Sequence, residues 1–293
     1  MRQHYVPEVY LRQWCDQDGQ LIRYCRAGPS DAPKLRSDRK SPKGICWEHN
    51  LYSLPDGGIA NGITGNGVET LLSQKVEQSI PAMVGALSSR SGLLDQILSE
   101  KLKWLMQTFV VRSPSMIEEI ESTAAEFVVE HEDMIRGLLG GALTPEMKAE
   151  VGQYLDPRMP AVAARAELAR IAATQFSPWR GWYEGRVHVL SLASVEPMLK
   201  ALGIDHFPTF DEPVVQWEDN AVGLVASFSV SPSILALVVR ETNASGWEVA
   251  LRHVISALRH RQFAICCRKA SDGLWLAQAQ NLIPWVPAKD LQP

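Results

Sequence analysis

The sequence lacks the long apolar run that a membrane-spanning helix requires, because no window reaches about eighteen consecutive apolar residues. Cysteine is also scarce. The five cysteines are an odd number, and Cys266 and Cys267 are adjacent, which is poor geometry for a structural disulfide. We therefore expect reduced thiols and a cytoplasmic protein that does not enter a membrane.

Neither sign of charge is in large excess. The chain has 29 basic and 33 acidic residues, a net charge of −4 and a pI of about 6.0. Such a chain has no global positive field to attract nucleic acid, so any such binding has to come from a local patch. The hydrophobic fraction of 46% is that of a soluble globular protein long enough to bury a substantial core.

Two common catalytic motifs are also missing. The chain contains no G-x-S-x-G nucleophile elbow, and no cysteine lies in a recognisable nucleophile context. The glycine-rich residues 57–67 lack the Lys-Ser/Thr ending of a phosphate-binding loop, and no strand leads directly into them. We interpret residues 57–67 as a flexible connector.

What the chain does have is an unusually apolar beginning. Residues 1–14, M-R-Q-H-Y-V-P-E-V-Y-L-R-Q-W, are too short and too interrupted by charge for a signal peptide. Chain termini are normally polar and loose, so a start this apolar has to be tied into the fold. We expect residues 3–14 to be ordered and to pack against the C-terminal sheet near Asp211.

Apolar periodicity divides the chain into three subregions of a single domain spanning 1–290. Residues 1–67 are predicted to form extended segments, with a polar surface loop over 26–44. Residues 68–178 show the three- and four-residue steps of helices. Residues 179–285 are predicted to be β-rich, with one late helix. Strands are expected at 21–25, 186–192, 214–217, 224–230, 234–239, 262–267 and 274–277.

Helix boundaries can also be predicted. Pro114 restarts a helix, with Ser115 and Glu118 at capping-box spacing, and Gly140 ends it. Thr144 caps the next helix. These patterns predict an α+β fold, in which a helical middle block packs against a C-terminal mixed or antiparallel sheet that the N-terminal segment joins.

Several short motifs occur in order along the chain. They are H-Y-V-P-x-x-Y-L-R-x-W at 4–14, N-x-Y-x-L at 50–54, E-x7-E at 69–77, Q-x4-R-S-P at 107–114, F-P-T-F-D-E-P-V at 207–214 and an S-P strand at 231–237. They resemble a bacterial family known as domain of unknown function 4238. Phe210 and Glu212 depart from its usual Ser and Asn. The resemblance implies a fold and a set of positions, but no reaction.

One interpretation gathers the charged motif residues into a catalytic site. His4, Glu69, Asp211 and Arg112 are the candidate catalytic residues, and Glu77 and Asp211 are the candidate ligands of Mg or Mn. Metal-assisted phosphodiester hydrolysis needs carboxylates for the cation, a base to activate water, and arginine to offset phosphate charge. Glu69 and Glu77 are eight residues apart, roughly 12 Å along a helix, so one ion cannot bind both directly.

The structural alternative is that these charges pair with one another. Buried Arg–carboxylate pairs are common outside active sites. In this interpretation the pairs fix the N-terminal segment against the helical block. Carboxylates close together and open to solvent would favour metal chemistry, whereas carboxylates held by an arginine would favour structure.

Candidate phosphate-binding or nucleic-acid-binding residues lie in two places. Arg12 belongs to the apolar opening. Arg252, Arg259 and His260 belong to the late helix, where Arg252 and Arg259 share a face, as do His253 and His260. The alternative is a solvated charged face over a buried apolar stripe.

Zinc is not expected. Cys15, Cys25, Cys46 and His49 include ligand-type side chains, but only Cys46 and His49 have a typical ligand spacing. Small buried cysteines are the simpler interpretation.

Two hypotheses of function follow from the sequence. The first is a bacterial cytoplasmic hydrolase, specifically a metal-dependent nuclease acting in antiviral defence or toxicity. The second is a non-catalytic ligand-sensing or scaffold protein that acts with a protein partner.

Overall fold

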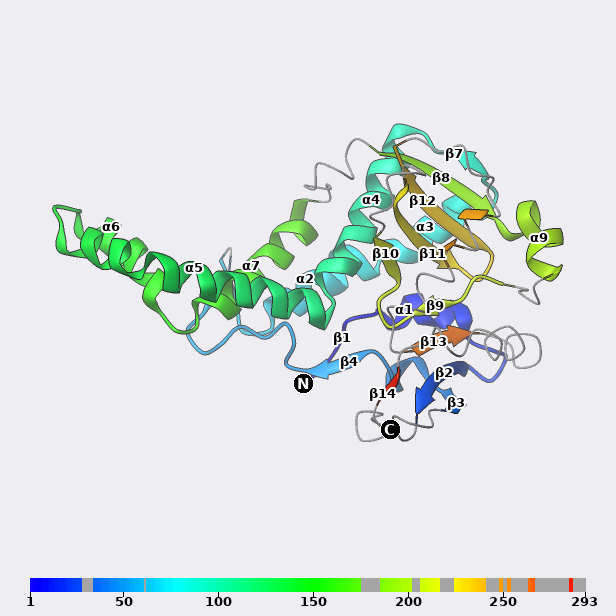
Figure 1. The fold of residues 1–293 in the computed structure, drawn as a ribbon, viewed down its shortest axis with the longest axis horizontal. Coiled ribbons are helices and arrows are strands. Elements are labelled where there is room, and N and C mark those ends of the chain that lie inside the picture. Colours follow the sequence, from blue (N-terminus) through cyan, green and yellow to red (C-terminus); the bar gives the residue numbers. More distant parts are fainter. Residues whose placement is uncertain are drawn as a thin grey trace.

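Helices form the middle of the chain in the computed structural model, as the apolar periodicity predicts (Figure 1). The structure describes residues 1–27, 34–60, 62–174, 185–201, 206–216, 224–240, 248–249, 252–253, 263–266 and 285–286. Its helices are α1 (Glu8–Leu11), η1 (Arg12–Trp14), η2 (Pro42–Gly44), α2 (Gly67–Leu72), η3 (Ser73–Glu77), α3 (Ser79–Leu87), α4 (Gln96–Val111), α5 (Pro114–Gly140), α6 (Pro145–Gly152), η4 (Gln153–Leu155), α7 (Met159–Thr174) and α9 (Leu192–Ala201).

Side-chain caps fix where the long helices begin. Asp95 caps α4 and Thr144 caps α6, each accepting a hydrogen bond from a backbone N–H of the first turn. The cap of α5 is Ser113, one residue before Pro114, so the predicted capping box at Ser115 is wrong. The hydroxyl of Ser115 donates instead to Glu212.

One antiparallel sheet contains most of the predicted C-terminal strands. Its order is β10 (Val214–Gln216), β11 (Leu224–Ser231), β12 (Ile234–Val239), β8 (Arg186–Ser191) and β7 (Gly92–Leu93). Every residue of β12 is buried, as its unbroken apolar run requires. Helix α4 packs against strands of this sheet, so the helical block and the sheet share one core (Figure 1).

The second large sheet joins the two ends of the chain. Its order is β14 (Trp285–Val286), β2 (Leu21–Ala27), β13 (Phe263–Cys266) and β9 (Thr209–Phe210), and β3 (Lys34–Lys40) pairs with β2. The predicted surface loop over 26–44 is therefore wrong, because it contains the charged strand β3. Two smaller pairs are β1 (Arg2–His4) with β4 (Trp47–His49) and β5 (Ile59–Ala60) with β6 (Ile63–Thr64). The α+β class is confirmed, and the strand through which the N-terminal region joins the C-terminal strands is β2.

The apolar opening is ordered and packs near Asp211, as predicted. Tyr10 and Trp14 are fully buried. The Tyr10 hydroxyl lies 2.5 Å from the carbonyl oxygen of Ser229, to which it donates, and 2.7 Å from the hydroxyl of Thr209. The indole N–H of Trp14 donates to the carbonyl of Phe207. The segment is thus bonded to residues around two hundred positions further along the chain.

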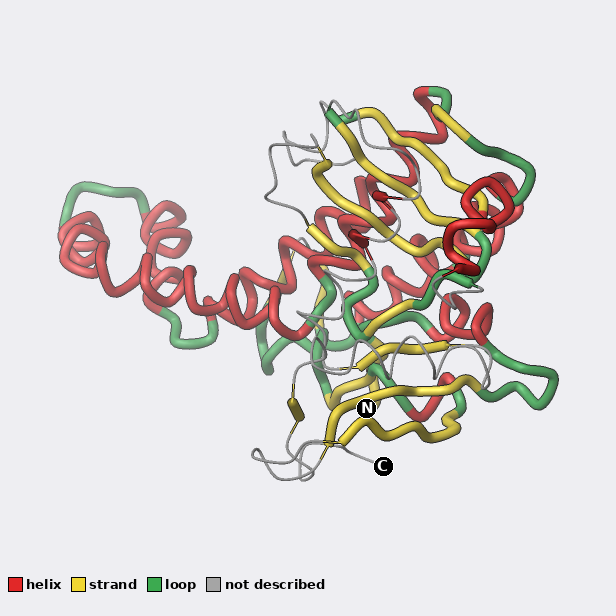
Figure 2. Tube along the Cα trace, turned by 45° about the vertical axis from the view of Figure 1, so that its right-hand side comes forward, coloured by secondary structure: helices red, strands yellow, loops and turns green. Residues whose placement is uncertain are grey.

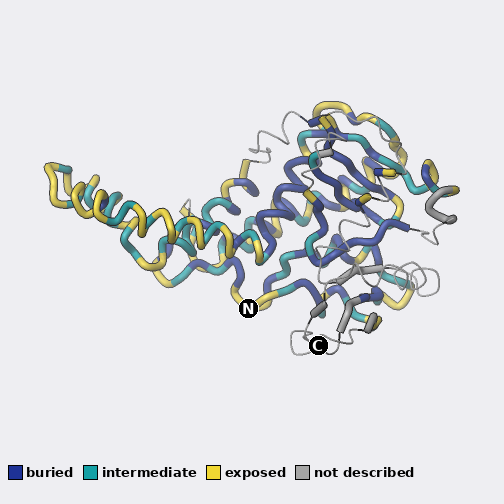
Figure 3. Tube along the Cα trace, viewed as in Figure 1, coloured by how far each residue is buried: buried dark blue, intermediate teal, exposed yellow. Residues whose placement is uncertain are grey.

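Helices α5, α6 and α7 extend away from the sheets as an arm, at the left of Figure 1 and again in the turned view of Figure 2. Helix α5 packs along α7, and the far part of the arm is largely exposed (Figure 3). Among the described residues, no helix combines the length and the apolar character needed to cross a membrane.

Candidate functional site

Arg112 is the centre of a buried polar cluster. It follows the last residue of α4, where the chain turns into α5, and its side chain is fully buried. One guanidinium nitrogen donates to the backbone carbonyl of His4 and to a carboxylate oxygen of Glu77, the latter at 3.2 Å. Arg112 therefore ties the N-terminal strand β1 to the end of the η3 turn.

Tyr52 is the second anchor of this cluster. Its hydroxyl donates to the backbone carbonyl of Arg112 at 2.8 Å and accepts from the Arg112 Nε at 3.3 Å. The tyrosine is fully buried, and burial raises its pKa above the ordinary value, so the hydroxyl keeps its proton. The backbone N–H of Tyr52 donates to Gln3, which secures the strand that carries His4.

Both predicted glutamates, Glu69 and Glu77, lie near Arg112. Glu77 accepts the hydrogen bond from Arg112, and Glu69 lies close enough for the guanidinium to act on its pKa. Glu77 is the last residue of the π-helical turn η3. The wider π turn changes the direction in which Glu77 points about the helix axis, relative to Glu69. Burial raises the pKa of Glu69 above its ordinary value, against the lowering effect of Arg112, and Glu77 adds to the rise.

Nε2 of His4 is buried and has no hydrogen-bond partner among the residues that the structure describes. The ring donates to the backbone carbonyl of Lys43, so Nδ1 is the donor. Burial lowers the pKa of His4 below the ordinary 6.5, and Arg112 acts in the same direction, against the raising effects of Glu8, Glu77 and Lys43. At neutral pH the ring is thus uncharged, with Nε2 as an acceptor.

His4, Tyr52, Glu69, Glu77 and Arg112 together form what we call the charged cluster. Within the described part of the chain, three of its atoms are buried without a hydrogen-bond partner: Nε2 of His4, Oε2 of Glu69 and Nη1 of Arg112. Buried polar atoms are nearly always hydrogen-bonded, so three such atoms in one cluster call for an occupant, either water or a ligand. They are an acceptor, a carboxyl group with a raised pKa, and a cationic donor.

Asp211 lies beside Tyr5 and Cys46. It is buried, and its charge helps to raise the pKa values of Tyr5 and Cys46, for which burial is the larger cause. Tyr5 also donates its backbone N–H to the carbonyl of Cys46. Asp211 therefore lies beside the N-terminal segment, as predicted.

The proposed phosphate-binding residues are not brought together in the described part of the chain. Arg12 is exposed and paired with Glu8. Arg252 is exposed on the late helix, whereas Arg259 and His260 lie outside the described residues. His253 is fully buried between the hydroxyls of Ser227 and Ser229, so the helix face that it was expected to share with His260 faces the core at this point.

The described residues contain no group of three or more His, Cys, Asp or Glu side chains arranged to hold a metal ion. Cys15 and Cys46 are reduced thiols, and burial is the main reason that the pKa of each is raised. The thiol of Cys25 lies outside the described side chains. Binding of Mg or Mn by Glu77 and Asp211 stays a prediction.

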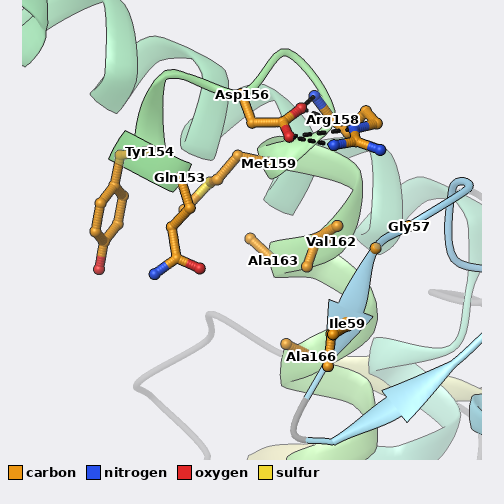
Figure 4. A pocket seen from close by; sticks show the side chains of 11 residues that line it. Gly57, Ile59, Gln153, Tyr154, Asp156, Arg158, Met159, Val162, Ala163 and Ala166 are labelled. Atoms are coloured by element: carbon orange, nitrogen blue, oxygen red, sulfur yellow. Dashed lines mark hydrogen bonds and ion pairs between the residues drawn. The ribbon is translucent and has the colours of Figure 1, made fainter. Parts of the chain in front are cut away.

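One groove lies away from the charged cluster, at the base of the arm (Figure 4). It holds about 520 Å³ between the β5–β6 hairpin and the start of α7, and none of the predicted site residues lines it. Val162, Ala163 and Ala166 form its apolar wall, and the guanidinium of Arg158 is paired with Asp156 at its rim.

Two residues near the charged motifs were not predicted as functional. Tyr52 stands in the N-x-Y-x-L motif, but its double contact with Arg112 cannot be read from spacing. Gln107, in the Q-x4-R motif, is fully buried, and neither amide atom has a hydrogen-bond partner among the described residues. A polar residue within the apolar run of α4 is the signal that could have identified it.

Comparison with known proteins adds one match. A family model described as "Protein of unknown function (DUF4238)" matches residues 2–176, more than half of the chain. The matched part includes the whole charged cluster and ends before β8, so the motifs at 207–214 and 231–237 lie outside it. No curated protein and no solved structure matches the chain.

Proposed function

Because the chain belongs to the DUF4238 family, whose description states no activity, we propose its function from the charged cluster: it is a bacterial cytoplasmic hydrolase of phosphodiesters that acts on nucleic acid. The observation that supports this proposal is the set of three buried atoms without partners, on His4, Glu69 and Arg112. They supply a base, an acid and a cation, which are the groups that such a reaction uses.

Each residue has a distinct role in the proposed reaction. Nε2 of neutral His4 takes a proton from the attacking water molecule, whose oxygen then bonds to phosphorus. The bond from phosphorus to the leaving oxygen breaks, and protonated Glu69 gives its proton to that oxygen. Burial lowers the pKa of His4 and raises that of Glu69, which favours the neutral form of each side chain, as the two roles require. Nη1 of Arg112 offsets the charge that develops on the phosphate oxygens.

A divalent cation remains part of the proposal. Mg or Mn would be held by oxygen ligands, and the candidates are Glu77 and Asp211. Glu77 already accepts a hydrogen bond from Arg112, which favours the acid–base route through His4 and Glu69. The biological setting that we propose is bacterial defence or toxicity, which predicts that expression of the active protein slows growth of a bacterial host.

The second candidate function is binding without turnover. It is supported by the Arg112–Glu77 ion pair, in which the buried cation already has a carboxylate partner. In this case the protein senses a ligand and acts through a protein partner, and the same unpaired atoms bind the ligand.

One experiment separates the two functions. The full chain is incubated with single-stranded RNA and with single- and double-stranded DNA, in Mg²⁺, in Mn²⁺ and in chelator. We expect cleavage that is lost in His4→Ala and in Glu69→Gln, and kept in His131→Ala and Glu119→Gln on α5. Circular dichroism checks that each variant is folded.

The reactions with Mg²⁺, Mn²⁺ and chelator test the role of a cation. Activity that persists in chelator supports acid–base catalysis by His4 and Glu69 without a metal ion. Absence of cleavage by the wild-type protein under every condition would overturn the hydrolase and favour the binding protein.

A further inference from the structure

The arm carries an unusual share of the exposed apolar surface. Of the ten large apolar side chains that are exposed in the described part of the chain, six lie between residues 127 and 154. Single exposed apolar residues are normal on soluble proteins, but their concentration in one place marks an interaction site. Four of the six belong to α5.

Apolar residues form a stripe along α5. Phe127, Met134 and Leu138 are 45%, 54% and 44% exposed, and they follow one another at steps of seven and four residues, which places them on one helix face. The ring of His131 lies on the same face and stacks on Phe127 with 4.3 Å between centroids. We call this face the α5 stripe; its members are Ile120, Ala124, Phe127, His131, Met134 and Leu138.

A hollow lies at the N-terminal half of the α5 stripe. It holds about 380 Å³ and is lined by Ile120, Ala124 and Phe127 of the stripe, with Thr123 and Glu119 beside them and Met159 of α7 opposite. Met159 also lines the larger groove of Figure 4. The hollow has room for one large apolar side chain of a partner.

One side of the stripe is bordered by carboxylates. Glu119, Glu126, Glu130 and Asp133 are exposed and follow one another at steps of seven, four and three residues. Among the described residues, none of these four forms an ion pair with a basic side chain. We call them the acidic row. Helix α5 as a whole has seven acidic residues and one arginine.

We propose that the α5 stripe binds an amphipathic, basic helix of another protein. The apolar face of that helix would lie on the stripe with one side chain in the hollow, and its Lys or Arg residues would lie over the acidic row. Helices bind apolar grooves in this way through anchors at helical spacing. The acidic row repels nucleic acid and anionic membranes. The acidic row also disfavours a second copy of the chain as the partner. If two copies paired through the α5 stripe about a two-fold axis, their acidic rows would lie close together and repel each other.

The probe for the proposal is a synthetic helical peptide with leucine at helical spacing on one face and lysine on the other. Its binding to the full chain is measured by fluorescence anisotropy and compared with the same peptide carrying glutamate in place of lysine. We expect the lysine peptide to bind more tightly, and its affinity to fall as salt rises.

Matched substitutions on α5 locate the binding face. We expect Phe127→Ser combined with Met134→Ser to weaken binding of the lysine peptide by about tenfold or more. Val129→Ser should leave it unchanged, because Val129 is 76% exposed on the opposite face. Glu126→Gln with Glu130→Gln should weaken binding and flatten its salt dependence, whereas Glu118→Gln, off the acidic row, should do neither.

Three results would overturn the proposal. The first is equal affinity for the two peptides, and the second is a loss in Val129→Ser as large as that in the stripe variant. The third is a stable dimer of the wild-type chain, seen by analytical ultracentrifugation, that Phe127→Ser dissociates; the stripe would then be a contact between copies. Circular dichroism of each variant checks that the protein is folded, so that a loss of binding is not caused by unfolding.

Discussion

Tyr52 and Arg112 are joined by two hydrogen bonds that run in opposite directions. The tyrosine hydroxyl donates to the arginine's backbone carbonyl, and the arginine's Nε donates back to that hydroxyl. The carbonyl belongs to the end of α4, where backbone acceptors lack helical partners. One hydroxyl therefore ends a helix and orients the guanidinium that serves the charged cluster.

Removing this hydroxyl should destabilise the fold. Tyr52→Phe leaves a buried carbonyl and a buried guanidinium N–H with one partner fewer, which costs about 1–3 kcal/mol. Urea denaturation measures the loss, with Tyr154→Phe as the control because Tyr154 is 40% exposed on the arm. Equal midpoints for the wild type and Tyr52→Phe would show that this hydrogen-bond pair contributes nothing.

Glu69 should make the fold less stable as the pH rises. Its pKa is raised in the folded protein, so the folded state holds the proton more tightly than the unfolded chain does. The stability from the neutral carboxyl is present at low pH and is lost as pH rises from about 4.5 through the folded pKa. Glu69→Gln should therefore match the wild type below that range and be more stable than it at pH 7.

Thermal melts of the two proteins at a series of pH values test this expectation. Glu119→Gln, at an exposed position of α5, is the control and should follow the wild type throughout. A Glu69→Gln protein that is less stable than the wild type at pH 7 would mean that attraction to Arg112 outweighs the cost of burying the charge.

The rate of cleavage, in turn, should depend on pH through both His4 and Glu69. His4 acts as the base and must be unprotonated, which its lowered pKa allows below pH 6.5. Glu69 acts as the acid and must be protonated, which its raised pKa allows above pH 4.5. We expect a bell-shaped profile of kcat/KM, which falls at low pH as His4 gains a proton and at high pH as Glu69 loses its proton. A rate that is constant from pH 5 to about pH 8 would exclude Glu69 as the acid.

A substitution of Asp211 tests whether this side chain acts through its negative charge or only as a hydrogen-bond acceptor. If its carboxylate only accepts hydrogen bonds beside the turn to Pro213, Asp211→Asn should retain both fold and activity, because the amide oxygen still accepts. We predict that Asp211→Asn keeps the fold and abolishes the activity, because the negative charge is needed to hold a cation. Asp133→Asn on the arm is the control. A fully active Asp211→Asn protein would leave Asp211 a structural role only.

Regular patterns in the sequence were sufficient to predict most of the fold. Helix α4 and strand β12 follow directly from apolar periodicity and from an unbroken apolar run. Strand β3 was missed because K-L-R-S-D-R-K is charged on both faces, and its strand form depends on pairing with β2. Such pairing depends on tertiary contacts, which a short stretch of sequence does not show.

The candidate site could be predicted only in part. The motifs identified His4, Glu69, Glu77 and Arg112, and the structure places all four together. The motifs could not identify the hydrogen bond that the His4 ring donates to the Lys43 carbonyl, which determines that Nδ1 carries the proton. His253 shows the converse, because helical spacing placed it on one face with His260, whereas two serines of β11 hold it in the core.

The bonds of Tyr10 and Trp14 to Ser229 and Phe207 also determine when the N-terminal segment can dock. The segment is synthesised about two hundred residues before these two anchors. Contacts this distant in sequence form late in folding. On the ribosome, Tyr10 and Trp14 therefore wait for their partners until most of the chain has emerged. The order of synthesis itself thus delays the burial of these two aromatic side chains until long after they have been made.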